Sequence, residues 1–208
     1  MTSLVKHLGP AQQLALFDDL NYLNIAEFRG FCDRHGIPYT IHVQTTSGRQ
    51  KKTRDTDRKA VVLDRIRHYL KTGAILPPTC FAASIVKLDC DPPEEFTASD
   101  RLYYGWYNKK NAALLAQLQQ LTGGKFRDGA VARLLLRDLW TAGKAPTLRQ
   151  FAKAWLNAEQ QGLGEHPECA WLTDRARKTA GSNWKAKRKR IAQRTLKILE
   201  KIPPPADE

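Results

Sequence analysis

The sequence predicts a mostly α-helical protein, with a small helical unit that carries an inserted β-hairpin, followed by a C-terminal helical bundle. Three observations predict this fold class. Apolar residues recur every three or four positions through most of the chain, between residues that typically cap helices. One segment near residue 40 alternates apolar and polar residues, as a strand does. A proline-rich stretch then separates two groups of helices.

Two helices are expected in the first 35 residues. The first runs from about Pro10 to Asp19, and the second from about Ile25 to His35. Asn24 is a good N-cap for the second helix, and Glu27 follows three residues later, as in a capping box. Gly36 supplies the left-handed residue that ends this helix.

A third helix is expected in the segment TDRKAVVLDRIRHYLKTG. Thr56 or Asp57 is the predicted cap, and Gly73 is the predicted end. Its apolar stripe consists of Val62, Leu63, Ile66, Tyr69 and Leu70. The basic residues of this segment, Arg58, Lys59, Arg65, Arg67 and Lys71, lie mostly off the stripe.

The segment between the second and third helices, residues 41–59, predicts a β-hairpin. Tyr39, Ile41 and Val43 alternate with polar residues, and Thr46-Ser47-Gly48 is a turn signal. The sequence RQKKTR then forms a polar return strand. We expect the apolar face of the hairpin to rest on the two helices that flank it.

The remaining chain is divided by a change of composition. Residues 1–76 are expected to form the first unit, 77–98 a proline-rich linker, 99–202 a helical domain and 203–208 a disordered tail. A short strand is an alternative for CFAASIVKL inside the linker. Five helices are expected in the second domain, in NKKNAALLAQLQQLTGG, RDGAVARLLLRDLWTAGK, APTLRQFAKAWLNAEQQGLG, HPECAWLTDRARKTAG and SNWKAKRKRIAQRTLKILEKI.

Charge is the strongest compositional signal. Among 208 residues, 34 are Lys or Arg and 21 are Asp or Glu, which gives a formal net charge of +13. Such a balance attracts polyanions, and nucleic acid is favoured over an anionic membrane surface or an acidic protein. No apolar run is long enough to span a membrane, and no signal peptide is recognised. We therefore expect a cytoplasmic protein, associated with the nucleoid if the source is bacterial.

The four cysteines do not form a metal-binding pattern. Cys32, Cys80, Cys90 and Cys169 include no C-x-x-C pair, and the histidines do not cluster with them. We expect buried free thiols rather than zinc ligands or disulfides. The sequence predicts no metal and no cofactor.

The helices on either side of the hairpin resemble the SAP motif, a helix-extension-helix unit. The resemblance covers residues 23–73, about a quarter of the chain. It is carried by Ile25, Phe28, Cys32, Gly36, Ile37 and Pro38, and then by Lys59, Leu63, Arg65, Ile66, Tyr69 and Leu70. This resemblance implies binding to duplex DNA through the DNA backbone, with little sequence preference. In the SAP motif the connection between the two helices is short, whereas in this chain nearly twenty residues connect them. The C-terminal half weakly resembles a bacterial domain of unknown function that follows divergent SAP motifs.

Two basic segments are the candidate nucleic-acid contacts. The first combines the return strand of the hairpin with the start of the third helix, and consists of Arg49, Lys51, Lys52, Arg54, Arg58 and Lys59. The alternative is a basic loop that is kept polar for solubility. The second lies on the last helix and consists of Lys185, Lys187, Arg188, Lys189 and Arg190. A solvated helix face is the alternative there.

A third segment, RLYYGWYNKKN, combines aromatic residues with cations. Such a pattern suits base stacking, but we expect these aromatic residues to pack in a helical core. No phosphate-binding loop or hydrolase motif occurs, and the acidic run at residues 89–95 is expected to be solvated rather than a nuclease site.

The sequence therefore predicts a non-enzymatic nucleic-acid-binding protein that contacts duplex DNA through backbone phosphates. The alternative is an RNA- or protein-binding subunit of a larger nucleoprotein complex, such as one of a phage, a mobile element or a defence system.

Overall fold

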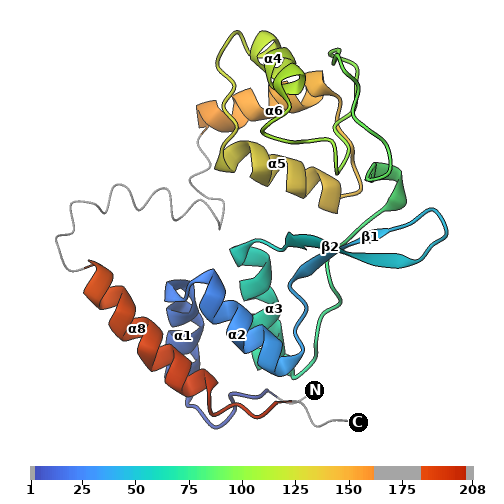
Figure 1. Ribbon diagram of the computed structural model, residues 1–208. Helices are drawn as coiled ribbons and strands as arrows, with labels where there is room; N and C mark the ends of the chain where they lie inside the picture. The colour runs from blue at the N-terminus through green and yellow to red at the C-terminus, as the bar shows by residue number, and fades with distance from the viewer. Residues whose placement is uncertain (1–2, 162–183, 205–208) are drawn as a thin grey trace. The chain divides into compact units, whose positions relative to one another are not determined.

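The computed structural model describes residues 3–161 and 184–204 (Figure 1). Over these two ranges the chain forms seven α-helices and one three-stranded sheet, which confirms a mostly helical protein. It divides into two compact units. The first contains residues 3–40, 54–78 and 184–204, and the second contains residues 41–53 and 79–161.

The elements of each unit come from separate parts of the sequence. The first unit holds α1 (Pro10–Asp19), the 3-10 helix η1 (Leu20–Tyr22), α2 (Ile25–His35), α3 (Lys59–Thr72) and α8 (Trp184–Leu199). The second holds most of β1 (Thr40–Gln44) and β2 (Gln50–Thr56), with β3 (Cys80–Phe81), η2 (Ala83–Ile85), α4 (Ala112–Leu121), α5 (Ala130–Thr141) and α6 (Leu148–Gln161).

Helix α2 begins and ends at the residues that the sequence predicts. The Asn24 side chain accepts a hydrogen bond from the Glu27 backbone N–H, and the Glu27 carboxylate accepts one from the Asn24 N–H. Gly36 ends the helix with φ of 66°, a conformation that glycine adopts without strain. The capping signals are local, so the sequence alone places this helix.

Helix α3 ends at Gly73 as predicted, but its N-cap position is Arg58 rather than Thr56 or Asp57. Arg65, which lies mostly off the predicted apolar stripe, is nevertheless buried. Its guanidinium lies 3.5 Å from the Asp57 carboxylate and donates hydrogen bonds to the carbonyls of Leu76 and Pro77. Burial of this cation is tolerated because charged and carbonyl oxygens surround it.

Helix α8 belongs to the first unit, where Figure 1 shows it beside α1. Ala192, Leu199 and Ile202 are buried in one apolar cluster with Phe28 and Ile66. The prediction instead assigned this helix to a C-terminal domain with α4, α5 and α6. The difference arises because an apolar stripe shows that a helix is buried on one side, but not which helices cover it.

The predicted hairpin is present, but its predicted position against α2 and α3 is wrong. Ile41 and Val43 are each 2% exposed and lie in the core of the second unit. There β1 pairs in parallel with β3, which places Val43 opposite Phe81. The sheet order is β2-β1-β3, so β2 lies at an edge.

The stretch predicted as a linker also contributes to the second core. Residues 77–98 contain three buried side chains: Phe81 in β3, Ile85 in η2, and Phe96. The prolines in this stretch prevent a helix, but they do not prevent an extended chain from burying its apolar side chains. The alternative of a short strand in this stretch is confirmed by β3.

Helices α4, α5 and α6 complete the second core, where α6 contacts both others. The aromatic segment packs against this core as expected, with Tyr104 buried and Tyr103, Trp106 and Tyr107 partly buried. The Tyr107 hydroxyl donates a 2.8 Å hydrogen bond to the Asp128 carboxylate. Burial and this acceptor raise the pKa of Tyr107.

Two further expectations concern cysteines and membranes. Cys32 is buried as predicted, whereas Cys80 is half-buried and Cys90 is exposed. Cys169 and the predicted helix around it lie outside the described residues, as does most of the predicted tail. Within the described ranges, every helix is too short or too polar to cross a bilayer.

Candidate nucleic-acid interface

The tip of the hairpin has a defined geometry. The Gly48 N–H donates a 2.9 Å hydrogen bond to the Thr45 carbonyl, and the Thr45 N–H donates a 2.8 Å hydrogen bond to the Arg49 carbonyl. Gly48 has φ of 79°. This is the pattern of a three-residue loop in which a tight turn is followed by one left-handed residue, which glycine favours. The Thr45 hydroxyl adds a 2.9 Å hydrogen bond to the Arg49 carbonyl and lies 3.0 Å from the Ser47 hydroxyl.

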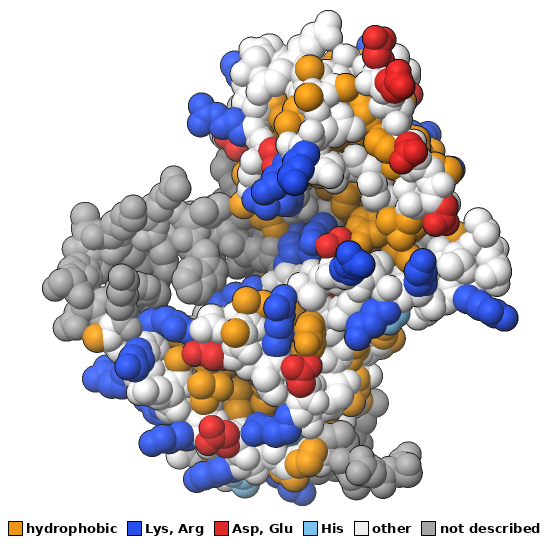
Figure 2. Space-filling model, in the orientation of Figure 1, with side chains coloured by type: hydrophobic (Ala, Val, Ile, Leu, Met, Phe, Trp, Pro, Cys, Tyr) orange, Lys and Arg blue, Asp and Glu red, His pale blue; other side chains and the backbone are white. Residues whose placement is uncertain are grey.

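Four of the predicted contact residues follow this turn on or next to β2. Arg49, Lys51, Lys52 and Arg54 are all exposed. Within residues 3–161 and 184–204, their side chains make no hydrogen bond or ion pair. Because strand side chains alternate, Lys52 and Arg54 lie on one face of β2 and Lys51 on the other. Figure 2 shows blue Lys and Arg side chains along the hairpin at the right of the view.

The last two residues of this predicted segment lie in a different environment. Arg58 and Lys59 are half-buried at the start of α3. The Lys59 ammonium donates a 2.7 Å hydrogen bond to the Asn21 carbonyl and lies 5.6 Å from the centre of the Phe28 ring. Burial and the nearby Arg188 lower the pKa of Lys59 to about 8, although Glu27 opposes this shift. Lys59 therefore makes its contacts inside the first unit rather than on its free surface.

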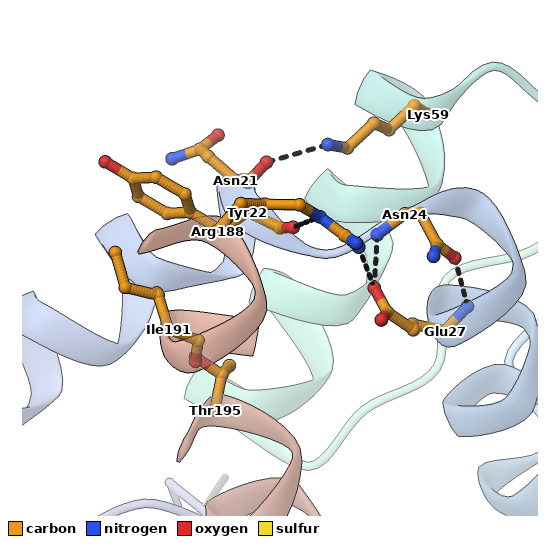
Figure 3. A network of polar contacts seen from close by, with 8 residues as sticks. All are labelled: Asn21, Tyr22, Asn24, Glu27, Lys59, Arg188, Ile191 and Thr195. Carbon is orange, nitrogen blue, oxygen red and sulfur yellow. Dashed lines mark hydrogen bonds and ion pairs between the residues drawn. The ribbon is translucent and has the colours of Figure 1, made fainter. Parts of the chain in front are cut away.

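Arg188 on α8 also makes contacts inside the first unit (Figure 3). Its Nε donates a 2.9 Å hydrogen bond to the Tyr22 carbonyl, and its Nη2 lies 2.6 Å from Glu27 Oε2. The same Glu27 carboxylate caps α2 by accepting from Asn24. One carboxylate thus joins the start of α2 to α8, and Arg188 is a structural residue.

The outer face of α8 holds three further exposed cations, besides Arg194, whose guanidinium pairs with the Asp19 carboxylate. Lys189 and Arg190 are exposed, as predicted, and so is Lys197, which the predicted contact set omits. Residues 192, 195 and 199 are buried and fix which side of the helix faces solvent. The spacing of these residues is visible in the sequence, and it indicates that Lys197 lies on the exposed side of the helix. The side chains of Lys185 and Lys187 lie outside the described residues.

The structure therefore separates the predicted contact residues into two surfaces and a structural group. We call Arg49, Lys51, Lys52 and Arg54 the hairpin cations, and Lys189, Arg190 and Lys197 the α8 cations. The hairpin cations lie on β2 and its turn, and the α8 cations lie on α8. Lys59 and Arg188 form the structural group, and Arg58 is half-buried at the start of α3.

Comparison with known proteins finds no family model, curated protein or solved structure that matches the chain. Function is therefore inferred from the residues themselves.

Proposed function

We propose that the protein is a non-enzymatic nucleic-acid-binding protein that contacts the phosphate backbone of duplex DNA. The observation that carries the proposal is the set of hairpin cations, four exposed charges within six residues. Their side chains have no acidic partner in the part of the chain that the structure describes. Cations that have no protein partner are available to replace the counterions of a phosphate backbone.

Three further features support this proposal. The closed turn holds the hairpin in one shape before binding, which reduces the entropy that binding would cost. The α8 cations supply a second basic surface, on the first unit. The resemblance of α2 and α3 to the SAP motif favours duplex DNA over RNA. The net charge of +13 adds a long-range attraction to any polyanion.

A binding panel tests this proposal. Fluorescence anisotropy would measure the affinity of the whole chain for duplex DNA, single-stranded DNA and duplex RNA, each at about 50 and 200 mM salt. We expect duplex DNA to bind most tightly and to lose about 10³-fold or more in affinity at the higher salt, as six or more phosphate contacts would require. Absence of binding, or an affinity that ignores salt, would contradict the proposal. Preference for RNA would support the RNA-binding subunit instead.

A further inference from the structure

The hairpin tip extends beyond the core to which the hairpin is attached. Ile41 and Val43 are buried, but every side chain from residue 44 to residue 52 is exposed, except that of Thr45, which is partly buried. Val43 is therefore the last buried residue of β1. About three residues in each arm lie beyond it, which at about 3.3 Å per residue gives a projection of about 10 Å.

These dimensions fit one groove of B-form DNA. Two paired strands lie about 4.8 Å apart, so the ribbon enters a major groove about 12 Å wide and about 8.5 Å deep. The minor groove is only about 6 Å wide. The major groove of duplex RNA is too deep and narrow for side chains to read.

The residue types at the tip differ from those behind it. Gln44, Arg49 and Gln50 can each form two hydrogen bonds with a base, since Arg pairs with guanine and Gln with adenine in the major groove. Lys51 and Lys52 come next and lie on opposite faces of the ribbon. With the tip in the groove, these two faces meet the two sugar-phosphate walls.

We propose that residues 44–50 enter the major groove of duplex DNA, where Arg49, Gln44 and Gln50 contact base edges. This inference rests on the proposed function but adds base readout to backbone binding. The backbone hydrogen bonds that close the turn, from Gly48 to Thr45 and from Thr45 to Arg49, fix the backbone from which these side chains extend.

The experiment selects duplexes from a randomised library with the whole wild-type chain and sequences those that bind. We expect a short motif that contains guanine. Replacing that guanine with 7-deazaguanine, which lacks the N7 acceptor, should then weaken binding about 10-fold. Arg49→Lys keeps the charge but loses the paired hydrogen bonds, so it should remove this 10-fold effect. Arg54→Lys is the matched control and should retain it.

The outcomes separate this inference from the proposed function. Binding that depends on salt but selects no motif would overturn base readout and leave backbone binding intact. A motif that tolerates 7-deazaguanine and Arg49→Lys would overturn the role of Arg49. Competition by netropsin, which occupies the minor groove, would overturn the choice of groove. Absence of binding to any duplex would overturn both proposals.

Discussion

His35 is a buried histidine whose protonated form the first unit disfavours. Its Nδ1 lies 3.2 Å from the Tyr69 hydroxyl, and its Nε2 accepts a 3.2 Å hydrogen bond from Arg34 Nε. Burial and the charge of Arg34 lower the pKa of His35 to about 4. The neutral ring therefore joins α2 to α3 in the folded protein.

Acid should destabilise the protein through His35. Its pKa is about 6.5 in the unfolded chain and lower in the fold, so the unfolded chain binds more protons between pH 6.5 and 4. The free energy of unfolding should therefore fall through this window as the pH falls, by about 1–3 kcal/mol. Urea unfolding at pH 7 and 4.5 would measure this loss. His35→Asn should reduce the difference, and an unchanged difference would contradict the assignment.

Arg188 should couple energetically to Glu27. We expect the double-mutant cycle of Arg188→Ala with Glu27→Gln to give about 1 kcal/mol of coupling, since both side chains are only partly exposed and the contact is a charged hydrogen bond. Urea unfolding measures each variant. Lys189→Ala removes the neighbouring exposed cation and should change stability by less than about 0.5 kcal/mol. Equal effects of Arg188→Ala and Lys189→Ala would argue against a structural role for Arg188.

At the residue scale, the sequence predicts capping better than it predicts charge exposure. Asn24, Glu27 and Gly36 act within one turn of the chain, so their roles follow from spacing alone. Arg65 and Arg188 are cations whose partners lie elsewhere in the chain. Their burial depends on the tertiary fold, and spacing does not reveal it.

Helix α8 is the element that completes the first unit. Besides its apolar contacts, the helix accepts a 2.7 Å hydrogen bond at the Leu199 carbonyl from the Arg34 guanidinium. A cation near the C-terminus of a helix also interacts favourably with the partial negative charge of the helix dipole at that end. The helix is thus held at its end by Arg34 and near its start by the Arg188–Glu27 pair.

Truncating an apolar side chain of α8 should destabilise the protein. Leu199 is 1% exposed, so Leu199→Ala should lower the free energy of unfolding by about 2–4 kcal/mol through lost burial and a cavity. The matched control is Leu14→Ala on α1, where the side chain is 69% exposed and the change should stay below about 0.5 kcal/mol. Thermal or urea unfolding would show the difference. If Leu199→Ala left the free energy of unfolding unchanged, α8 would not pack in this cluster.

At the element scale, the sequence predicts which segments are helices and strands but not their partners. The alternation that ends at Val43 predicts a strand with one buried face. It does not indicate whether α2 and α3, or β3 and the second core, bury that face. Contacts between residues far apart in the sequence decide which elements bury that face. The pattern of a single sequence does not reveal those contacts.

The whole molecule is assembled from two units that are both discontinuous in sequence. The chain passes between them after residue 40, after residue 53 and after residue 78, and α8 then returns to the first unit. Changes of composition along the sequence predict domains that follow one another, so they do not predict two units that are each built from separate segments. The basic surfaces of the hairpin and of α8 nevertheless follow from the sequence, because charge density is local.

The two basic surfaces should contribute separately to binding. Replacing Lys189, Arg190 and Lys197 with Ala should lower the salt dependence of DNA affinity by up to about 0.9 for each phosphate contact that is lost. Combined with replacement of Arg49, Lys51, Lys52 and Arg54 by Ala, these losses should add, since each phosphate contact releases its own counterions. Affinity measured over a range of salt concentrations tests this. An unchanged salt dependence in the triple variant would exclude α8 from the contact.

The central claim is that the hairpin cations contact duplex DNA, with Lys51, Lys52 and Arg54 at phosphates, and a charge-matched comparison tests it most directly. One variant replaces Arg49, Lys51, Lys52 and Arg54 with Ala, and the other replaces the exposed Lys109, Lys110, Lys125 and Arg127 with Ala. Both lose four positive charges, and the slope of log affinity for duplex DNA against log salt is measured for each. We predict that the hairpin variant loses about 3 from the slope, at about 0.9 for each of three phosphate contacts, and the control less than about 1. Equal losses would contradict the claim.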